Sequence, residues 1–138
     1  KWVAHQLNKI LRFMDNYGEL SRIYGNVKIG KNVSLRGYTV IQGGEVGVEI
    51  GDNCVFSVNV LILVDDHSSS FKKSAPIKIG ENVFIGANTI ILRGCEIGDN
   101  AVIGAVSIIT SFKKIPSNEI WAGVPARKIG EVKNVVQK

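Results

Sequence analysis

A single histidine preceded by two aspartates is the group in this sequence best suited to acid–base chemistry. His67 stands in the segment ILVDDHSSS, directly after Asp65 and Asp66. Imidazole ordinarily titrates near neutral pH, so it can take a proton from an attacking hydroxyl group. Either carboxylate, or a backbone carbonyl, could hold the far imidazole nitrogen. A loop histidine is also commonly an inert surface residue, and the aspartates could equally form a solvated acidic turn.

The elements that must position His67 follow a period of six residues. Isoleucine recurs at every sixth residue from Ile79 to Ile109, glycine follows four of these six isoleucines, and small residues recur four places after an isoleucine. A period of six fits neither a helix nor a plain alternating strand. Fixed short periods of this kind are typical of parallel β-helices, in which each repeat is a short strand plus a corner.

The same frame runs through the first half of the chain and places His67 at an interruption. Between Ile62 and Ile79 there are 17 residues instead of six, so about 11 leave the coil as an extruded loop, expected over residues 65–76. Such a loop can overhang the side of a prism and enclose a substrate. The apolar inward positions define about four coils of about 18 residues, each with three flat faces: Ile29, Leu35, Ile41; Ile50, Phe56, Ile62; Ile79, Ile85, Ile91; and Ile97, Ile103, Ile109.

The two ends of the chain differ from the coil. Residues 1–22 are predicted to form an amphipathic helical cap on the first coil, because apolar residues recur there at helical spacing: Val3, Leu7, Ile10, Leu11 and Met14. The coil domain is expected over residues 23–129, and a C-terminal tail over residues 130–138.

Composition sets loose limits on location and partners. The 138 residues fit one domain, no apolar run approaches the roughly 20 residues of a membrane span, and no signal peptide is visible. Cys54 and Cys95 occupy small inward slots, so we expect packed thiols, and a cytoplasmic protein. The net charge of +5 suits an anionic ligand or reflects an ordinary basic surface.

The repeats, the VDDH loop and the closing segment IPSNEIWAGVPARKI together resemble the hexapeptide-repeat acyltransferases. These include maltose and galactoside acetyltransferases, serine acetyltransferases, and the xenobiotic and polysaccharide O-acetyltransferases. The resemblance covers roughly Val27 to Ile129. It implies an all-β, left-handed parallel β-helix, a homotrimer, acetyl-coenzyme A as the donor, and His67 as the catalytic base, with no metal, nucleic acid or membrane span expected.

The resemblance also implies a set of coenzyme-binding positions. It places Ala87 and Ala105 along the pantetheine arm, Thr110 further along the groove, and Arg127 near the nucleotide. The family's lysine after this threonine is Ser111 here, so Lys113 or Lys114 is expected to replace it. Two further departures are Val106, which stands where the family has glycine, and two extra residues before Ile115.

The acceptor is less specified. Glu45 matches an acidic acceptor-binding position of galactoside acetyltransferases, where a carboxylate would accept hydrogen bonds from sugar hydroxyls, although a solvated corner explains it as well. The favoured function is acetyl transfer to a hydroxyl of a sugar or polysaccharide precursor. Serine O-acetylation and amino-sugar N-acetylation on the same scaffold remain alternatives. The carbonic anhydrase class needs three histidine ligands, and this chain has two histidines.

Overall fold

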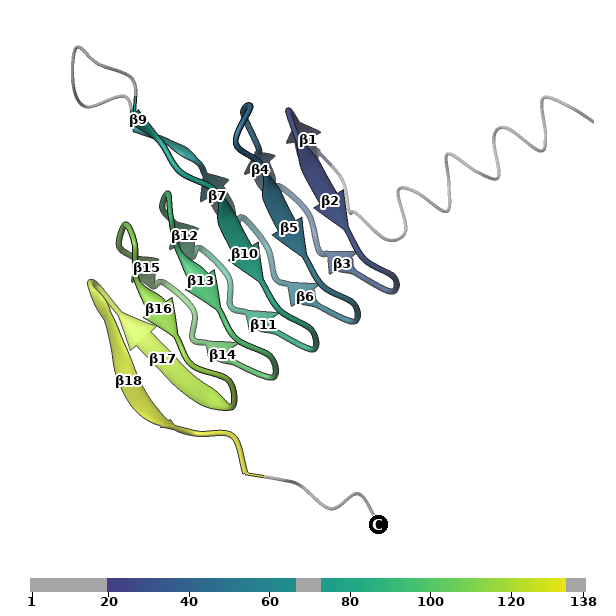
Figure 1. Cartoon of the computed structure of the whole chain (residues 1–138). Helices are drawn as coiled ribbons and strands as arrows, with labels where there is room; N and C mark the ends of the chain where they lie inside the picture. The colour runs from purple at the N-terminus through teal and green to yellow at the C-terminus, as the bar shows by residue number, and fades with distance from the viewer. Residues whose placement is uncertain (1–19, 67–72, 134–138) are drawn as a thin grey trace, which may run out of the picture.

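A parallel β-solenoid of four full turns forms the body of the molecule (Figure 1). The structure is a computed structural model that describes residues 20–66 and 73–133, and all regular elements in these ranges are strands. Residues 1–19 of the predicted N-terminal cap, the end of the predicted tail, and His67 fall outside the described residues. Arg22, the last residue of the predicted cap, begins a strand instead.

Three parallel sheets, here called faces A, B and C, form the sides of the solenoid, and each full turn contributes one strand to each face. Face A contains β1 (Arg22–Tyr24), β4 (Val40–Gln42), β7 (Leu61–Leu63), β12 (Ile90–Ile91) and β15 (Ile108–Ile109). Face B contains β2 (Val27–Ile29), β5 (Val48–Ile50), β10 (Ile77–Ile79), β13 (Glu96–Ile97) and β16 (Lys114–Ile115). Face C contains β3 (Ser34–Leu35), β6 (Val55–Phe56), β11 (Phe84–Ile85), β14 (Val102–Ile103), β17 (Glu119–Gly123) and, antiparallel to β17, β18 (Ala126–Glu131).

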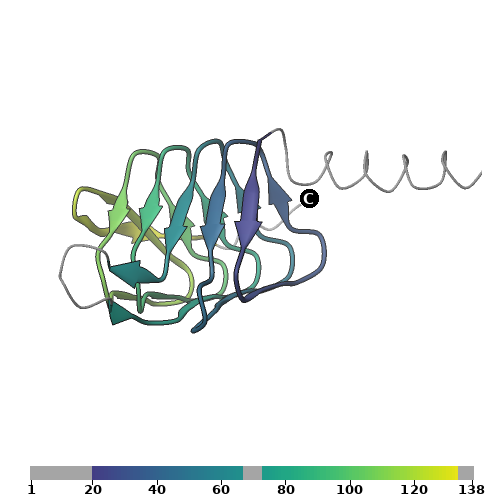
Figure 2. The same ribbon diagram turned by 90° about the horizontal axis from the view of Figure 1, so that it is seen from above.

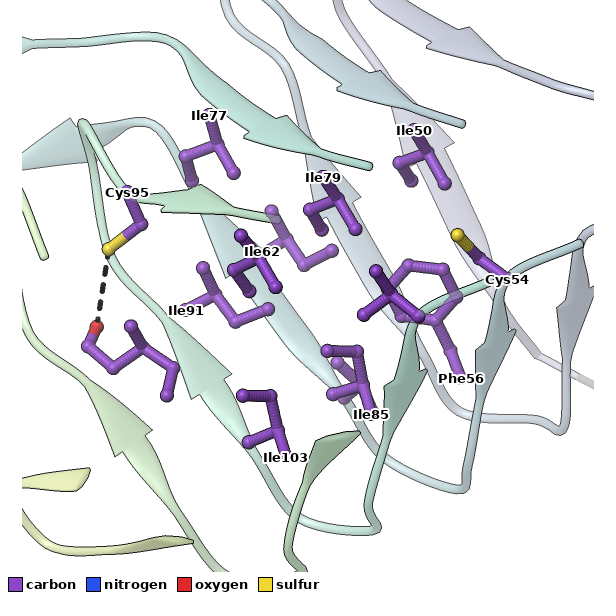
Figure 3. Close-up of a cluster of buried hydrophobic side chains, with 14 of the residues drawn as sticks. Ile50, Cys54, Phe56, Ile62, Ile77, Ile79, Ile85, Ile91, Cys95 and Ile103 are labelled. Atoms are coloured by element: carbon purple, nitrogen blue, oxygen red, sulfur yellow. Dashed lines mark hydrogen bonds between the residues drawn. The ribbon is translucent and has the colours of Figure 1, made fainter. Parts of the chain in front are cut away.

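The six-residue frame predicted from the sequence is confirmed by the strand register. Ile79 lies opposite Ile50 and Ile97 in the neighbouring turns, and the other inward residues stack in the same way. All of them are buried except Ile29 in the first turn, which is half-buried. Burial of each such side chain contributes about 1.5–3 kcal/mol, so this column is the main source of stability. Figure 3 shows part of the column, with Cys54 and Cys95 in its small slots as predicted.

The inward series continues beyond Ile109, the last inward position predicted from the sequence. Ile115 is buried and pairs with Ile97, and Trp121 is half-buried and pairs with Ile103. The segment SFKK therefore completes one more step of six residues instead of bulging from the coil.

The corners between faces use a left-handed residue three places after an inward residue. Asparagine is common there because its short polar side chain tolerates positive φ. Side-chain amides also link successive turns: Asn82 donates to Asn100 at 3.2 Å and Asn100 donates to Asn118 at 3.1 Å. Val106 occupies this position with φ 56°, which is unfavourable for a β-branched residue.

A two-stranded antiparallel segment leaves the solenoid between β7 and β10. It consists of β8 (Asp65–Asp66) and β9 (Lys73–Ser74), paired through Asp65 with Ser74 and Asp66 with Lys73. Figures 1 and 2 show this pair projecting away from the stacked turns. The predicted excursion from the coil is therefore present at the corner between faces A and B.

The outward residues of the three faces differ in chemistry. Face B presents exposed alternating charges in register: Lys28, Glu49, Lys78, Glu96 and Lys114. Face A presents an apolar row: Val40, Leu61, Ile90 and Ile108. Face C presents a second apolar row: Val55, Phe84, Val102 and Ile120. Faces A and C therefore each carry an apolar outer row, which begins after Arg22 on face A and after Ser34 on face C.

Candidate active site

Asp65 is a buried carboxylate at the point where the extruded segment leaves face A. It is 9% exposed, and it accepts hydrogen bonds from the Ser74 hydroxyl at 2.6 Å and from the Gln42 side-chain amide at 3.1 Å. Ser74 lies on the returning strand and Gln42 on the preceding turn. Buried carboxylates require such partners, so Asp65 fixes the start of the segment to its end and to the coil.

Asp66, the residue before His67, forms an ion pair with an arginine of the next turn. Its Oδ2 lies 3.7 Å from Nη2 of Arg93, and the two side chains are 31% and 18% exposed respectively. The Arg93 guanidinium carbon lies 4.9 Å from the ring centroid of Phe112, which is one turn further along. The two aspartates that precede His67 in the sequence are thus held by different partners.

Ala87 and Ala105 lie at a different corner, between faces C and A. Ala87 follows β11 and Ala105 follows β14, one turn later in the stack. The Val106 amide donates to the Ala87 carbonyl at 2.8 Å. Within the described residues, the Ala87 and Ala105 amides donate to no backbone carbonyl. These two amides are therefore available for amide or carbonyl groups of a ligand lying along this corner.

The candidate phosphate-binding cations occupy distinct places. Lys113 lies with its Nζ 5.9 Å from the Trp121 ring centroid, and its amide donates to the Thr110 carbonyl at 3.2 Å. Lys114 points outward on face B, 3.8 Å from Glu96. Arg127 is exposed on β18. Of the two candidate replacements for the family lysine, Lys113 is the one adjacent to Thr110.

Glu45 is exposed at the corner between faces A and B in the first full turn. Its carbonyl accepts a 3.5 Å hydrogen bond from the Asn26 amide. An open hollow of about 210 Å³ adjoins this corner, and its lining includes Asn26, Val46 and Pro76. Pro76 belongs to the return of the extruded segment, so the hollow lies between the Glu45 corner and that segment.

Two groups of predicted site residues lie at different corners of one chain. Asp65, Asp66 and Glu45 lie at the corner between faces A and B, whereas Ala87 and Ala105 lie at the corner between faces C and A. Face A separates the two corners. The described aspartates and the proposed pantetheine contacts of a single chain therefore do not lie at one corner.

Four residues near the extruded segment were not singled out from the sequence: Gln42, Ser74, Arg93 and Phe112. For three of them, the repeat frame of the sequence already indicated a place at this corner. Ile41, Ile91 and Ile109 are equivalent inward positions, so Gln42, Arg93 and Phe112 follow them at the same corner as Asp65. Ser74 lies outside the frame, and only the pairing of β8 with β9 places it.

The two cysteines are unsuited to nucleophilic catalysis. Both are fully buried, and burial raises the pKa of Cys54 and of Cys95 above the ordinary thiol value. Their thiols donate instead to backbone carbonyls, of Gly80 at 3.0 Å and of Thr110 at 3.1 Å. No cluster of three His, Cys, Asp or Glu side chains among the described residues is arranged to hold a metal ion. The same part of the chain contains no helix long and apolar enough to cross a membrane.

Comparisons with known proteins agree with this fold. Residues 76–111 match a family model described as bacterial transferase hexapeptide (six repeats), and residues 26–63 match one described as hexapeptide repeat of succinyl-transferase. Galactoside O-acetyltransferase from Escherichia coli (strain K12) is 41% identical over 118 residues, which cover 79% of this chain and 56% of that protein. The chain spans about half the length of the curated relatives it matches.

Solved structures show the same solenoid. A galactoside acetyltransferase in complex with coenzyme A has a TM-score of 0.72 and 33% identity, covering 95% of this chain and 72% of that one. A hexapeptide-repeat acetyltransferase from Vibrio cholerae O1 biovar eltor, complexed with acetyl coenzyme A, has a TM-score of 0.71 at 21% identity, covering 94% and 79%. At this low identity, the structural likeness supports the fold alone. With its left-handed parallel β-helix and its two repeat matches, this chain belongs to the hexapeptide-repeat acetyltransferase family.

Proposed function

We propose that this protein is an acetyl-coenzyme A-dependent O-acetyltransferase that acetylates a hydroxyl group of a sugar or polysaccharide precursor. The observation that carries the proposal is the segment extruded between faces A and B, with Asp65 and Asp66 fixed at its base and His67 next in sequence. Support for the substrates comes from the galactoside acetyltransferase relatives, one of them with coenzyme A bound. A cytoplasmic location fits this choice of donor.

The proposed reaction is a direct transfer with both substrates bound. His67 takes the proton of the acceptor hydroxyl as its oxygen attacks the thioester carbonyl. The tetrahedral intermediate then expels coenzyme A as the thiolate, which receives the proton from the imidazolium. A covalent acetyl-enzyme on a cysteine is disfavoured, because both thiols are buried and their raised pKa keeps them protonated at neutral pH.

The coenzyme is proposed to lie along the corner between faces C and A. The Ala87 and Ala105 amides would pair with pantetheine carbonyls, as peptide groups do at a strand edge. One of them could instead stabilise the developing oxyanion. Lys113 and Arg127 would attract the phosphates of the nucleotide end. Glu45 is proposed to bind a hydroxyl of the acceptor.

A homotrimer would bring the two groups of site residues together. In the proposed trimer, the corner that carries Asp66 on one chain lies close to the corner that carries Ala105 on the next. Faces A and C are the apolar ones, while face B is charged and suited to solvent.

The oligomer has a direct test with a matched control. Ile90→Glu places a charge in the middle of the apolar row on face A, whereas Lys78→Glu changes a charge on face B. Analytical ultracentrifugation should show a trimer for the wild type and for Lys78→Glu, and smaller species for Ile90→Glu. A wild-type monomer at micromolar concentration would contradict the assembly.

The reaction itself is tested by a screen of acetyl-coenzyme A consumption. Methyl β-galactoside, maltose, glucosamine and serine represent the competing acceptor classes, and mass spectrometry of the product distinguishes O- from N-acetylation. Saturable turnover with a sugar hydroxyl supports the proposal. Turnover with serine or an amino group alone would replace it with one of the alternatives, and no turnover with any hydroxyl acceptor would count against it.

A further inference from the structure

Arg93 has surroundings that packing of the coil does not explain. Its side chain is 18% exposed, and its guanidinium contacts both Asp66 at 3.7 Å and the Phe112 ring at 4.9 Å. Its Nε is buried and has no hydrogen-bond partner among the described residues. An unpaired buried N–H group is unfavourable for folding, so stability alone does not account for an arginine in this position.

The backbone around Arg93 connects the extruded segment to the last turns of the coil. The Gly94 amide donates to the carbonyl of Ala75, at the return of the segment, at 3.3 Å. The Phe112 amide donates to the Arg93 carbonyl at 2.9 Å. The Phe112 ring lies directly over Gly94, where a Cβ atom would overlap it. The corner between faces A and B is thus continuous through three levels. The extruded segment contacts the turn that carries Arg93, and that turn contacts the one that carries Phe112.

The two contacts of Arg93 need a guanidinium and not simply a positive charge. A planar guanidinium can stack on an aromatic ring while its edge nitrogens face a carboxylate. A lysine ammonium can make one of these contacts well but not both. Phe112 is itself held in the left-handed region at φ 62° and is 58% exposed, so its ring supports Arg93 on one side and meets solvent on the other.

We propose that Arg93 is a positioning residue for the acetyl transfer. It holds Asp66 against the turn of the coil that carries Arg93 and Phe112, and so fixes the residue that precedes His67 in the sequence relative to the coil. This inference rests on the proposed function, in which His67 is the base. Displacement of a catalytic group by about 1 Å can lower the rate by about 100-fold, so a residue that never touches substrate can control kcat.

The test compares Arg93→Gln, Arg93→Lys and Phe112→Leu with Lys78→Gln, a control that removes an exposed charge on face B. Assays use acetyl-coenzyme A and methyl β-galactoside, or the best acceptor from the screen. We expect kcat to fall roughly 10- to 100-fold in Arg93→Gln and less in Arg93→Lys and Phe112→Leu. The KM for acetyl-coenzyme A should stay within about twofold, because the coenzyme contacts are unchanged.

A double-mutant cycle separates positioning from a general loss of structure. If Arg93 acts through Asp66, Asp66→Asn combined with Arg93→Gln should be no slower than the slower single variant. Faster amide hydrogen exchange confined to residues 65–76 in Arg93→Gln is also expected, with the coil strands unchanged. Additive losses, or a loss explained by a lower melting temperature in every variant, would overturn the inference.

The same assays distinguish failure of this inference from failure of the proposed function. If His67→Ala is inactive while Arg93→Gln and Arg93→Lys retain full kcat, His67 remains the base and the positioning role is wrong. If His67→Ala is fully active, the proposed mechanism is wrong, and the Arg93 inference is lost with it.

Discussion

The carboxylate of Asp65 accepts a 2.6 Å hydrogen bond from the hydroxyl of Ser74, and this contact joins the two ends of the extruded segment. The same carboxylate accepts a bond from Gln42 on the preceding turn. The first aspartate of the VDDH motif is therefore a structural anchor, whereas the second, Asp66, faces Arg93. The two adjacent carboxylates have different partners and so are expected to respond differently to substitution.

Ser74→Ala should lower the free energy of unfolding by about 1–3 kcal/mol, because it leaves the buried Asp65 with one partner fewer. Ser111→Ala, which removes an exposed hydroxyl at the same corner two turns later, is the control and should change stability by less than about 0.5 kcal/mol. Urea denaturation of both variants measures the difference. Equal stability of Ser74→Ala and wild type would mean that the anchor contributes nothing.

Val106→Asn should stabilise the protein by about 1–2 kcal/mol. The left-handed backbone at φ 56° is sterically unfavourable for valine, whereas asparagine tolerates that conformation. Asn88 is the equivalent residue in the preceding turn, and the Asn88→Val variant is the reciprocal control. It should be destabilised, also because it loses a 2.8 Å bond from Asn59. Thermal unfolding of the two variants should move in opposite directions, and a melting temperature of Val106→Asn below that of wild type would refute the strain.

The buried thiols predict a loss of stability at alkaline pH. Burial raises the pKa of Cys54 and Cys95 in the folded protein, so above about pH 9 the unfolded chain loses protons that the folded chain keeps. The contribution of these thiols to the free energy of unfolding is fully present below the pKa that they have in the unfolded chain. It declines as pH rises above that pKa, by up to about 1.4 kcal/mol per pH unit for each thiol. The variant with Cys54→Ala and Cys95→Ala should show a shallower decline between pH 8 and 10.5. Parallel curves for the two proteins would contradict this account.

Arg127→Ala should raise the KM for acetyl-coenzyme A, with about 1–3 kcal/mol at stake for a charge-assisted phosphate contact. Lys128→Ala is a close control on the same strand, because Lys128 is already paired with Glu131 at 3.0 Å and Glu119 at 3.4 Å. Isothermal titration with coenzyme A gives the affinity without any acceptor. Unchanged affinity in Arg127→Ala, or an equal loss in Lys128→Ala, would remove Arg127 from the proposed site.

The repeat frame made the fold predictable, because a buried column of isoleucines leaves its period directly in the sequence. The predicted frame ended at Ile109, and the structure adds Ile115 as a further inward residue of the column. The side-chain contacts at the corners were harder to predict from the sequence. The contact of Gln42 with Asp65 joins residues 23 positions apart, and the contact of Arg93 with Asp66 depends on which way two long side chains turn at a corner. A period describes inward positions and carries no information on such orientations.

The central claim is that His67 acts as the general base, and His67→Ala tests it most directly. The variant should assemble like wild type, because His67 is not one of the inward positions of the repeat frame. Its kcat should fall about 100- to 10,000-fold, the usual contribution of a positioned base. The chain's other histidine provides the control, and His5→Ala should keep wild-type kcat. Steady-state turnover of both variants, with affinity for coenzyme A measured alongside, is the decisive measurement. A His67→Ala protein that is assembled, binds coenzyme A and turns over at a near-normal rate would contradict the mechanism.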